Sequence, residues 1–171
     1  QTDIGVSVPP LLPQPWRDIN TITASYGHGM AVTPLHLAQA VASIASGGER
    51  VSPRFLMNGS EADKSGDIPT SVRVMSEESA YKMQQLMRLV VKQGTGKKAD
   101  VPGYGVGGKT GTAEKIVAGR YDRKKVMSSF VGVFPVHSPQ YLVFAMVDEP
   151  KGQKESFGYA TGGWVAAPVV Q

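Results

Sequence analysis

The sequence predicts a mixed α/β fold of the α+β kind, in which an antiparallel sheet is flanked by helices. Two amphipathic patterns in the first hundred residues have the spacing of α-helices. The last third instead contains apolar, β-branched segments of strand length. A short connection, residues 135–140, joins the last two segments, which are therefore expected to form an antiparallel hairpin. The helices are expected at 34–47 and 76–93, and the strands at 104–117, 127–134 and 141–148.

Each predicted helix carries its own start and stop signals. Pro34 suits the first turn of the first helix, and Gly47 suits the position just after its end. Ser76 can cap the second helix, and Gly94 ends it. The apolar face of this second helix is expected to consist of Met83, Leu86, Met87 and Val90.

The other segments are predicted to be irregular or short. Residues 1–17 contain four prolines, which disfavour regular structure and indicate a surface loop. Residues 50–74 read as short extended pieces around a polar loop. The Gly162–Gly163 pair precedes an apolar stretch that is expected to begin a closing helix.

Composition places the 171-residue chain among ordinary globular domains, with 41% hydrophobic, 19% charged and 8% aromatic residues. The net charge is +4, but the basic residues are scattered apart from short clusters, which argues against nucleic-acid binding. Without cysteine there is no disulfide framework and no zinc–thiolate site. No apolar run has the length of a membrane span. The opening "QTDIGVSVPP" reads as mid-chain, so we expect a fragment of a longer protein.

The stretch "GYGVGGKTGTAEK", residues 103–115, matches three motifs that imply different chemistry. It fits the dinucleotide pattern G-x-G-x-x-G, the phosphate-binding pattern G-x-x-x-x-G-K-[ST], and K-T-G. A phosphate-binding loop needs a buried strand before it and a helix after it. The charged "KQGTGKKADVP" upstream offers no buried strand, and the predicted hairpin conflicts with the parallel strands of such proteins. The context therefore disfavours both nucleotide motifs.

The K-T-G motif has the context that it requires. A glycine-punctuated strand with β-branched residues beyond the motif can line the edge of a cleft, where Gly111 leaves room for a substrate backbone. Thr112 then offers a hydroxyl and a backbone N–H at the same place. Three letters alone also fit a Gly-Thr turn beside a solvated lysine.

Four segments together carry a more specific signal: "TASYGHGMAVTPLHLAQAVASIASGG", "VVKQGTGKKADVPGYGVGGKTGTAEK", "SSFVGVFPVHSPQYLVFAMVDEP" and "ATGGWVAAPVV". In this order they resemble the transpeptidase domain of class B penicillin-binding proteins, most of all the septal enzyme of bacterial cell division. The resemblance runs from about residue 20 to the C-terminus.

This resemblance implies a five-stranded antiparallel sheet flanked by helices and an acyl-serine mechanism that needs no cofactor. It implies peptidoglycan stem peptides as the substrate and β-lactam antibiotics as covalent inhibitors. It also implies a periplasmic location, cell-division membrane proteins as partners, and an N-terminal membrane anchor outside this sequence.

The resemblance also assigns roles to individual residues. Lys109 matches the motif lysine of the cleft, and Thr110 and Thr112 match the hydroxyls that bind the carboxylate of the substrate or antibiotic. The backbone N–H of Thr112 matches one of two oxyanion donors, a kind of contact often worth ~3 kcal/mol in the transition state. Lys109 and Thr112 are thus the catalytic candidates, and Thr110, Gly111 and Thr112 the substrate-binding ones.

Further side chains are placed beside the cleft by the resemblance. His28 in "YGHG" matches a cleft-lining position, with a surface-loop histidine as the alternative. Tyr159, together with Phe157, is expected to contribute to an aromatic wall, although "ATGG" departs from some relatives here. His36 and His137 are expected to be structural, because no metal-ligand spacing links the histidines.

The catalytic motifs S-x-x-K and S-x-N are expected before "YGHG", but the sequence does not contain them there. "SAYK", Ser79 to Lys82, falls inside the second helix, where ordinary helical spacing explains it. Residues 1–171 are therefore expected to be the C-terminal portion of a transpeptidase domain, without its nucleophile. A class D β-lactamase and a non-catalytic β-lactam sensor are the alternatives, and a P-loop NTPase is a remote fourth.

Overall fold

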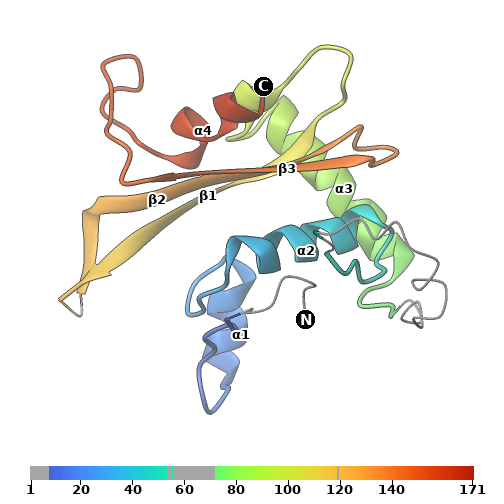
Figure 1. Ribbon diagram of the computed structural model, residues 1–171, viewed down its shortest axis with the longest axis horizontal. Helices are drawn as coiled ribbons and strands as arrows, with labels where there is room; N and C mark the ends of the chain where they lie inside the picture. Colours follow the sequence, from blue (N-terminus) through green and yellow to red (C-terminus); the bar gives the residue numbers. More distant parts are fainter. Residues whose placement is uncertain (1–7, 54, 56–71, 119) are drawn as a thin grey trace.

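The computed structural model describes residues 8–171 except 54, 56–71 and 119 (Figure 1). It confirms the predicted α+β class, with helices on both sides of an antiparallel sheet in the order β1-β2-β3. The sheet of the described residues thus contains three of the five strands that the resemblance implies. The elements are α1 (Asp18–Ser25), α2 (Pro34–Ala45), α3 (Glu77–Lys92), η2 (Lys97–Ala99), β1 (Gly107–Val117), β2 (Arg120–Phe134), β3 (Tyr141–Asp148), α4 (Gly162–Val165) and η3 (Ala167–Val170).

Helix α2 begins and ends where its sequence signals predict. The hydroxyl of Thr33 accepts a hydrogen bond from the backbone N–H of His36, and Pro34 occupies the first turn. Gly47 follows the helix at φ +75°, a left-handed conformation that glycine adopts without steric cost. The imidazole of His36 also accepts from the N–H of Thr33, so this histidine has the structural role expected of it.

Helix α3 is also where it was predicted, with Ser76 as its N-cap. Its buried side was predicted wrongly in part, because Met83 and Leu86 are 42% and 55% exposed. Only a neighbouring surface decides which side of a helix is buried, and here the contacting side includes a glutamine. The amide of Gln84 donates to two carbonyls at the end of α2, which satisfies a polar group in the interface. The buried residues are Ala80, Gln84, Met87 and Val91.

The sheet places the K-T-G strand at one edge. Strand β2 lies in the middle, and β3 pairs with β2 from Met127↔Asp148 to Phe134↔Tyr141, as the predicted hairpin requires. Strand β2 is longer than predicted, because its polar first half pairs with the end of β1 beyond a bulge at Glu114/Lys115. These two strand ends form an arm that projects from the body of the molecule (Figure 1).

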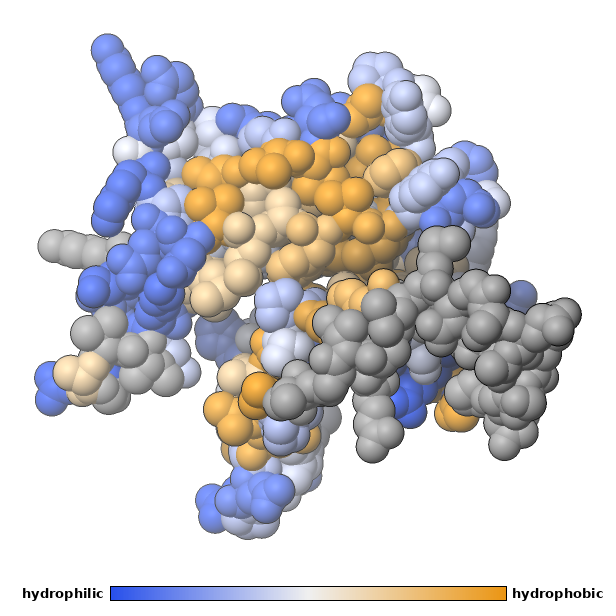
Figure 2. All heavy atoms as spheres, in the orientation of Figure 1, coloured by the Kyte–Doolittle hydropathy of each residue, from blue (hydrophilic) through white to orange (hydrophobic). Residues whose placement is uncertain are grey.

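Two apolar clusters cover the opposite faces of the sheet. Phe130 is fully buried on the face toward α4 and η3, whereas Val131 and Val133 are buried on the face toward α2. This alternation is the period of two expected for a strand that is covered on both sides. Figure 1 shows α4 and α2 on opposite sides of the sheet, and Figure 2 shows apolar residues gathered over the middle of the molecule.

Helix α1 was missed by the sequence analysis, because "DINTITAS" has no apolar stripe and none of its residues is buried. The predicted closing helix is short: α4 is followed by η3, which contains Pro168. Most of the predicted extended region at 50–74 lies outside the described residues.

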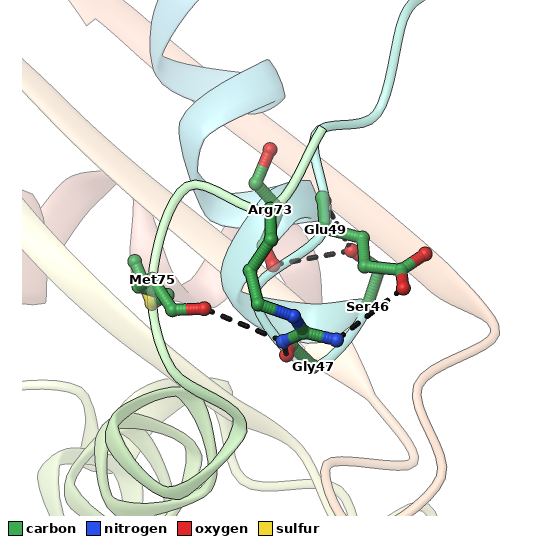
Figure 3. Close-up of polar contacts among 6 residues, drawn as sticks. Ser46, Gly47, Glu49, Arg73 and Met75 are labelled. Carbon is green, nitrogen blue, oxygen red and sulfur yellow. Dashed lines mark hydrogen bonds and ion pairs between the residues drawn. The ribbon is translucent and has the colours of Figure 1, made fainter. Parts of the chain in front are cut away.

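Arg73 links the residues that follow α2 to those that precede α3 (Figure 3). Its guanidinium donates to the carbonyls of Gly47 at 2.9 Å and Met75 at 3.4 Å, and it pairs with the Glu49 carboxylate at 3.3 Å. Arg73 therefore joins the C-terminal end of α2 to the residues that lead into α3.

Candidate active site

The KTGT segment, Lys109 to Thr112, lies in the first half of the edge strand β1. Lys109, Thr110, Gly111 and Thr112 pair with Val131, Phe130, Ser129 and Ser128 of β2. The other side of β1 has no neighbouring strand among the described residues. An edge strand presents backbone N–H and C=O groups that an extended ligand can approach. The motif therefore stands where the sequence analysis required it.

The two threonine side chains lie on the face toward α4. Thr112 shares its face with its partner Ser128, and the backbone N–H of Gly162 at the start of α4 donates to the Thr112 hydroxyl at 3.1 Å. The hydroxyl oxygens of Thr110 and Thr95 are 2.7 Å apart, and either can be the donor. A hydroxyl that accepts one hydrogen bond still has its own proton to donate. Both threonines can therefore donate to an anion.

Lys109 and Gly111 belong to the other face of β1. The Lys109 ammonium is exposed and donates to the carbonyl of Thr110 at 2.7 Å. A Cβ atom on Gly111 would lie 2.5 Å from the hydroxyl oxygen of Ser129, closer than real contacts allow. A larger residue at position 111 would therefore force the Ser129 hydroxyl to rotate away, in addition to filling the room for a substrate expected from the sequence.

Two glycines bring α4 against the motif. A Cβ atom on Gly162 would lie 2.3 Å from the carbonyl oxygen of Ser129, and one on Gly163 would lie 2.3 Å from that of Thr95. The hydroxyl of Ser128 also donates to the carbonyl of Ala160. These contacts hold the Gly162 N–H at the Thr112 hydroxyl.

The described contacts of His28 are with Tyr26 and Thr23, and not with the KTGT segment. It follows α1, is exposed, and its ring centroid is 5.3 Å from that of Tyr26. Its backbone N–H donates to the carbonyl of Thr23. Among the described residues, none of these contacts reaches β1, so the cleft-lining role of His28 stays a prediction.

The loop between β3 and α4 carries the two candidate wall residues. Tyr159 is 60% exposed, and its N–H donates to the carbonyl of Ser156. Phe157 is 81% exposed at φ +52°, and its ring centroid is 6.2 Å from that of Trp164. The Lys98 ammonium lies 3.8 Å above the Trp164 ring. The aromatic wall stays a prediction, although both rings are accessible.

The "SAYK" residues have ordinary helical partners. The N–H of Ser79 donates to the Ser76 hydroxyl at the N-cap of α3, and the two hydroxyls are 2.8 Å apart. Lys82 pairs with Glu78 at 2.6 Å, one turn away, with both side chains largely exposed. A nucleophilic serine requires a base within hydrogen-bond reach, and here the lysine is bound elsewhere.

The geometry also excludes a nucleotide-binding loop at 103–110. After Gly108, the described chain continues as a strand of an antiparallel sheet, whereas phosphate binding requires a helix N-terminus at that point. The described residues contain no cluster of three or more potential metal ligands.

Three residues near the motif were not identified from the sequence. Thr95 and Gly162 contact the motif threonines, and Arg88 on α3 donates to the carbonyl of Val106, just before β1. The guanidinium of Arg88 also binds the Asp100 carboxylate, which lowers the pKa of that carboxyl group. For Thr95 and Gly162, the only sequence signal was their place in the "VVKQGTG" and "ATGG" segments of the family resemblance.

Lys115 lies farther along β1, beyond the KTGT segment. The carboxylates of Asp148 and Glu149 raise the pKa of its ammonium group.

Comparison with known proteins supports the family resemblance that the sequence shows. The family model described as "Penicillin binding protein transpeptidase domain" matches residues 5–171. The probable peptidoglycan D,D-transpeptidase FtsI of Caulobacter vibrioides is 41% identical over 98% of this chain and 29% of its own length. Stage V sporulation protein D of Bacillus subtilis is 35% identical over 89% of this chain and 24% of its own length. The chain thus spans less than a third of these relatives.

Solved structures have the same fold. The transpeptidase domain of Burkholderia pseudomallei penicillin-binding protein 3 has a TM-score of 0.74 at 40% identity, over 92% of this chain and 45% of that one. Penicillin-binding protein 3 of Mycobacterium tuberculosis, complexed with ampicillin, has a TM-score of 0.79 at 30% identity, over 94% and 38%. The chain therefore belongs to the penicillin-binding protein transpeptidase domain family and corresponds to the C-terminal part of that domain.

Proposed function

We propose that this chain is the K-T-G-bearing part of a peptidoglycan D,D-transpeptidase, which cross-links stem peptides through an acyl-serine intermediate. The observation that carries the proposal is the KTGT segment on an edge strand, with the hydroxyls of Thr110 and Thr112 on one face. Thr112 accepts from Gly162 and can donate its proton, and Thr110 can donate its own when Thr95 is the donor between the two hydroxyls. The relatives named as D,D-transpeptidases support it.

The chemistry divides between this chain and the rest of the domain. A serine outside the chain attacks the carbonyl carbon of the donor peptide, the leaving amine departs, and an acyl-serine ester forms. An amine of a second stem peptide then attacks the ester, which forms the cross-link and regenerates the serine. In both steps the developing oxyanion needs N–H donors. We assign the backbone N–H of Thr112 to this task.

The side chains of the motif bind the charged end of the donor. The hydroxyls of Thr110 and Thr112 donate to the carboxylate of the stem peptide, and the Lys109 ammonium supplies positive potential on the other face of β1. Hydrogen bonds to a charged group are worth about 1.5–3 kcal/mol. Gly111 keeps the edge of the strand open, and His28 and Tyr159 contact more distant parts of the ligand.

β-Lactam antibiotics are the expected covalent inhibitors, because they present a carboxylate and a reactive carbonyl to the same groups. The Mycobacterium tuberculosis relative has been solved in complexes with aztreonam and with ampicillin. In an intact protein that contains this chain, we expect β-lactams to bind covalently to the nucleophilic serine.

We place the intact enzyme at the periplasmic face of the bacterial inner membrane, in septal wall synthesis with cell-division membrane proteins. The resemblance to the septal enzyme supports this placement. None of the helices in the described part of the chain is long and apolar enough to cross a membrane. The N-terminal anchor that the resemblance implies belongs to this proposal.

The test uses the intact protein that contains these residues. It should form a long-lived adduct with penicillin and should cross-link stem peptides in a purified assay. Rapid release of hydrolysed penicillin would instead indicate a class D β-lactamase. A stable adduct without any cross-linking would indicate a β-lactam sensor. The absence of any adduct would contradict the acyl-serine proposal.

A further inference from the structure

Arg88 links helix α3 to the residues that lead into the K-T-G strand. One nitrogen of its guanidinium, Nη1, donates to the Asp100 carboxylate at 2.8 Å and to the Val106 carbonyl at 2.5 Å. The Arg88 side chain is only 24% exposed and that of Asp100 31%. Charge-assisted hydrogen bonds of this kind are about twice as strong as neutral ones.

The two acceptors are the two ends of one loop, residues 100–106. Gly103 and Gly105 adopt φ values of +87° and +61° within this loop. Glycines leave a chain many alternative conformations, so the loop by itself constrains the start of β1 only weakly. Arg88 restricts this freedom by holding both ends with a single nitrogen. The Gly105 carbonyl adds a second restraint, because it accepts a hydrogen bond from the Val136 N–H.

The position of Val106 determines the position of the motif that follows. A Cβ atom on Gly107 would lie 2.5 Å from the Val136 side chain, and one on Gly108 would lie 2.5 Å from Phe130. The start of β1 is therefore tightly packed and has little room to adjust. A displacement at Val106 would pass along the strand to Lys109, because among the described residues strand β1 has a partner strand on one side only.

We propose that Arg88 is a positioning residue for the reaction: it holds the start of β1 so that the Thr112 N–H faces the reacting carbonyl. This inference rests on the proposed transpeptidase function. A misplacement of about 1 Å in a reacting geometry can cost about 100-fold in rate. The contribution of Arg88 is therefore expected in the acylation step and not in the initial binding of the ligand.

The chain offers a matched control in Lys92. Its ammonium lies 3.7 Å from the same Asp100 carboxylate, and it comes from the same helix. No contact of Lys92 with Val106 exists in the described part of the chain. Lys92→Met therefore removes a cation from Asp100 and leaves the carbonyl before β1 in place.

The experiment compares Arg88→Met, Arg88→Lys and Lys92→Met in the intact protein. Stopped-flow acylation by penicillin gives the dissociation constant of the first complex and the acylation rate constant. We expect Arg88→Met to lower the rate constant at least tenfold and to change the dissociation constant less than threefold. Arg88→Lys should recover part of the rate, and Lys92→Met should stay within twofold of the wild type in both constants.

Hydrogen exchange gives a readout that does not depend on acylation. The amides of residues 107–112 should exchange at least tenfold faster in Arg88→Met than in the wild type, and the amides of β3 should not. Unchanged exchange, or an acylation rate within twofold of the wild type, would overturn the positioning role. If the wild type itself is not acylated, the proposed function fails, and the exchange result alone decides the role of Arg88. Should Arg88→Met not fold, the neutral variant Arg88→Gln takes its place, with the same losses expected.

Discussion

The hydroxyl oxygens of Thr95 and Thr110 lie 2.7 Å apart, although the two residues belong to different elements. Thr95 follows α3, and Thr110 is the second residue of the KTGT segment on β1. If Thr110 donates its only proton to a ligand carboxylate, Thr95 must be the donor between the two hydroxyls. Thr95 thereby orients the proton that Thr110 offers to the ligand.

Replacing Thr95 with Val should therefore weaken the recognition of the ligand carboxylate by Thr110. We expect acylation by penicillin to fall about tenfold, the equivalent of one hydrogen bond of about 1.4 kcal/mol. Thr95→Ser keeps the hydroxyl and should stay close to the wild type. The measurement compares acylation rates of the intact protein with penicillin and with its methyl ester, which has no carboxylate. A similar loss for both compounds would rule out this role.

Gly162→Ala should disturb both stability and the site. The new methyl group would lie 2.3 Å from the carbonyl oxygen of Ser129 and 2.5 Å from that of Gly111. Overpacking of this kind costs about 1–3 kcal/mol, and the relaxation moves the N–H that binds Thr112. Urea denaturation should show a lower free energy of unfolding. Acylation of the intact protein by penicillin should also be slower. Thr161→Ala is the control, because the Thr161 side chain makes no capping hydrogen bond; an equal effect there would contradict the prediction.

Lys109→Ala should affect acylation and leave the fold intact. The Lys109 side chain is exposed, and its hydrogen bond in this structure is to the adjacent carbonyl of Thr110. We expect acylation by penicillin to fall at least tenfold, with a melting temperature close to that of the wild type. Lys115→Ala is the opposite control, because Lys115 pairs with Asp148 and Glu149 and should contribute to stability instead. An unchanged acylation rate in Lys109→Ala would remove the K-T-G assignment.

The pKa of Asp100 predicts a pH dependence of stability. The hydrogen bond from Arg88 is the main cause that lowers this pKa in the folded state. The stabilisation is therefore present above the ordinary aspartate pKa of about 3.9 and is lost as the pH falls through the lower folded value. The melting temperature of Asp100→Asn should lie below that of the wild type at pH 6, and the difference should shrink toward pH 2. A difference that does not vary with pH would show that Asp100 contributes no linked stability.

The sequence predicted those elements whose signals are local. The ends of α2 and β3 follow from Pro34, Gly47 and an apolar run between turns. The first half of β2 was missed because "RYDRKK" lacks alternation, and its pairing with β1 is a contact between strands that local signals do not show. Local signals could identify Lys109 to Thr112 as the motif. They could not identify Thr95 or Gly162 as its supports, since these contacts join segments that are 15 and 50 residues apart.

The last prediction concerns Ser79 and the 171 residues as an isolated chain. Acyl transfer needs a nucleophile and a base within hydrogen-bond reach, facing the oxyanion donors. The hydroxyl of Ser79 is bound at the cap of α3, and Lys82 pairs with Glu78. We therefore expect intact-mass spectrometry to show no adduct after incubation of this chain with excess penicillin, whereas the intact protein should be labelled. A stoichiometric mass increase that disappears in Ser79→Ala would make Ser79 the nucleophile and would overturn the assignment of this chain as one wall of a larger site.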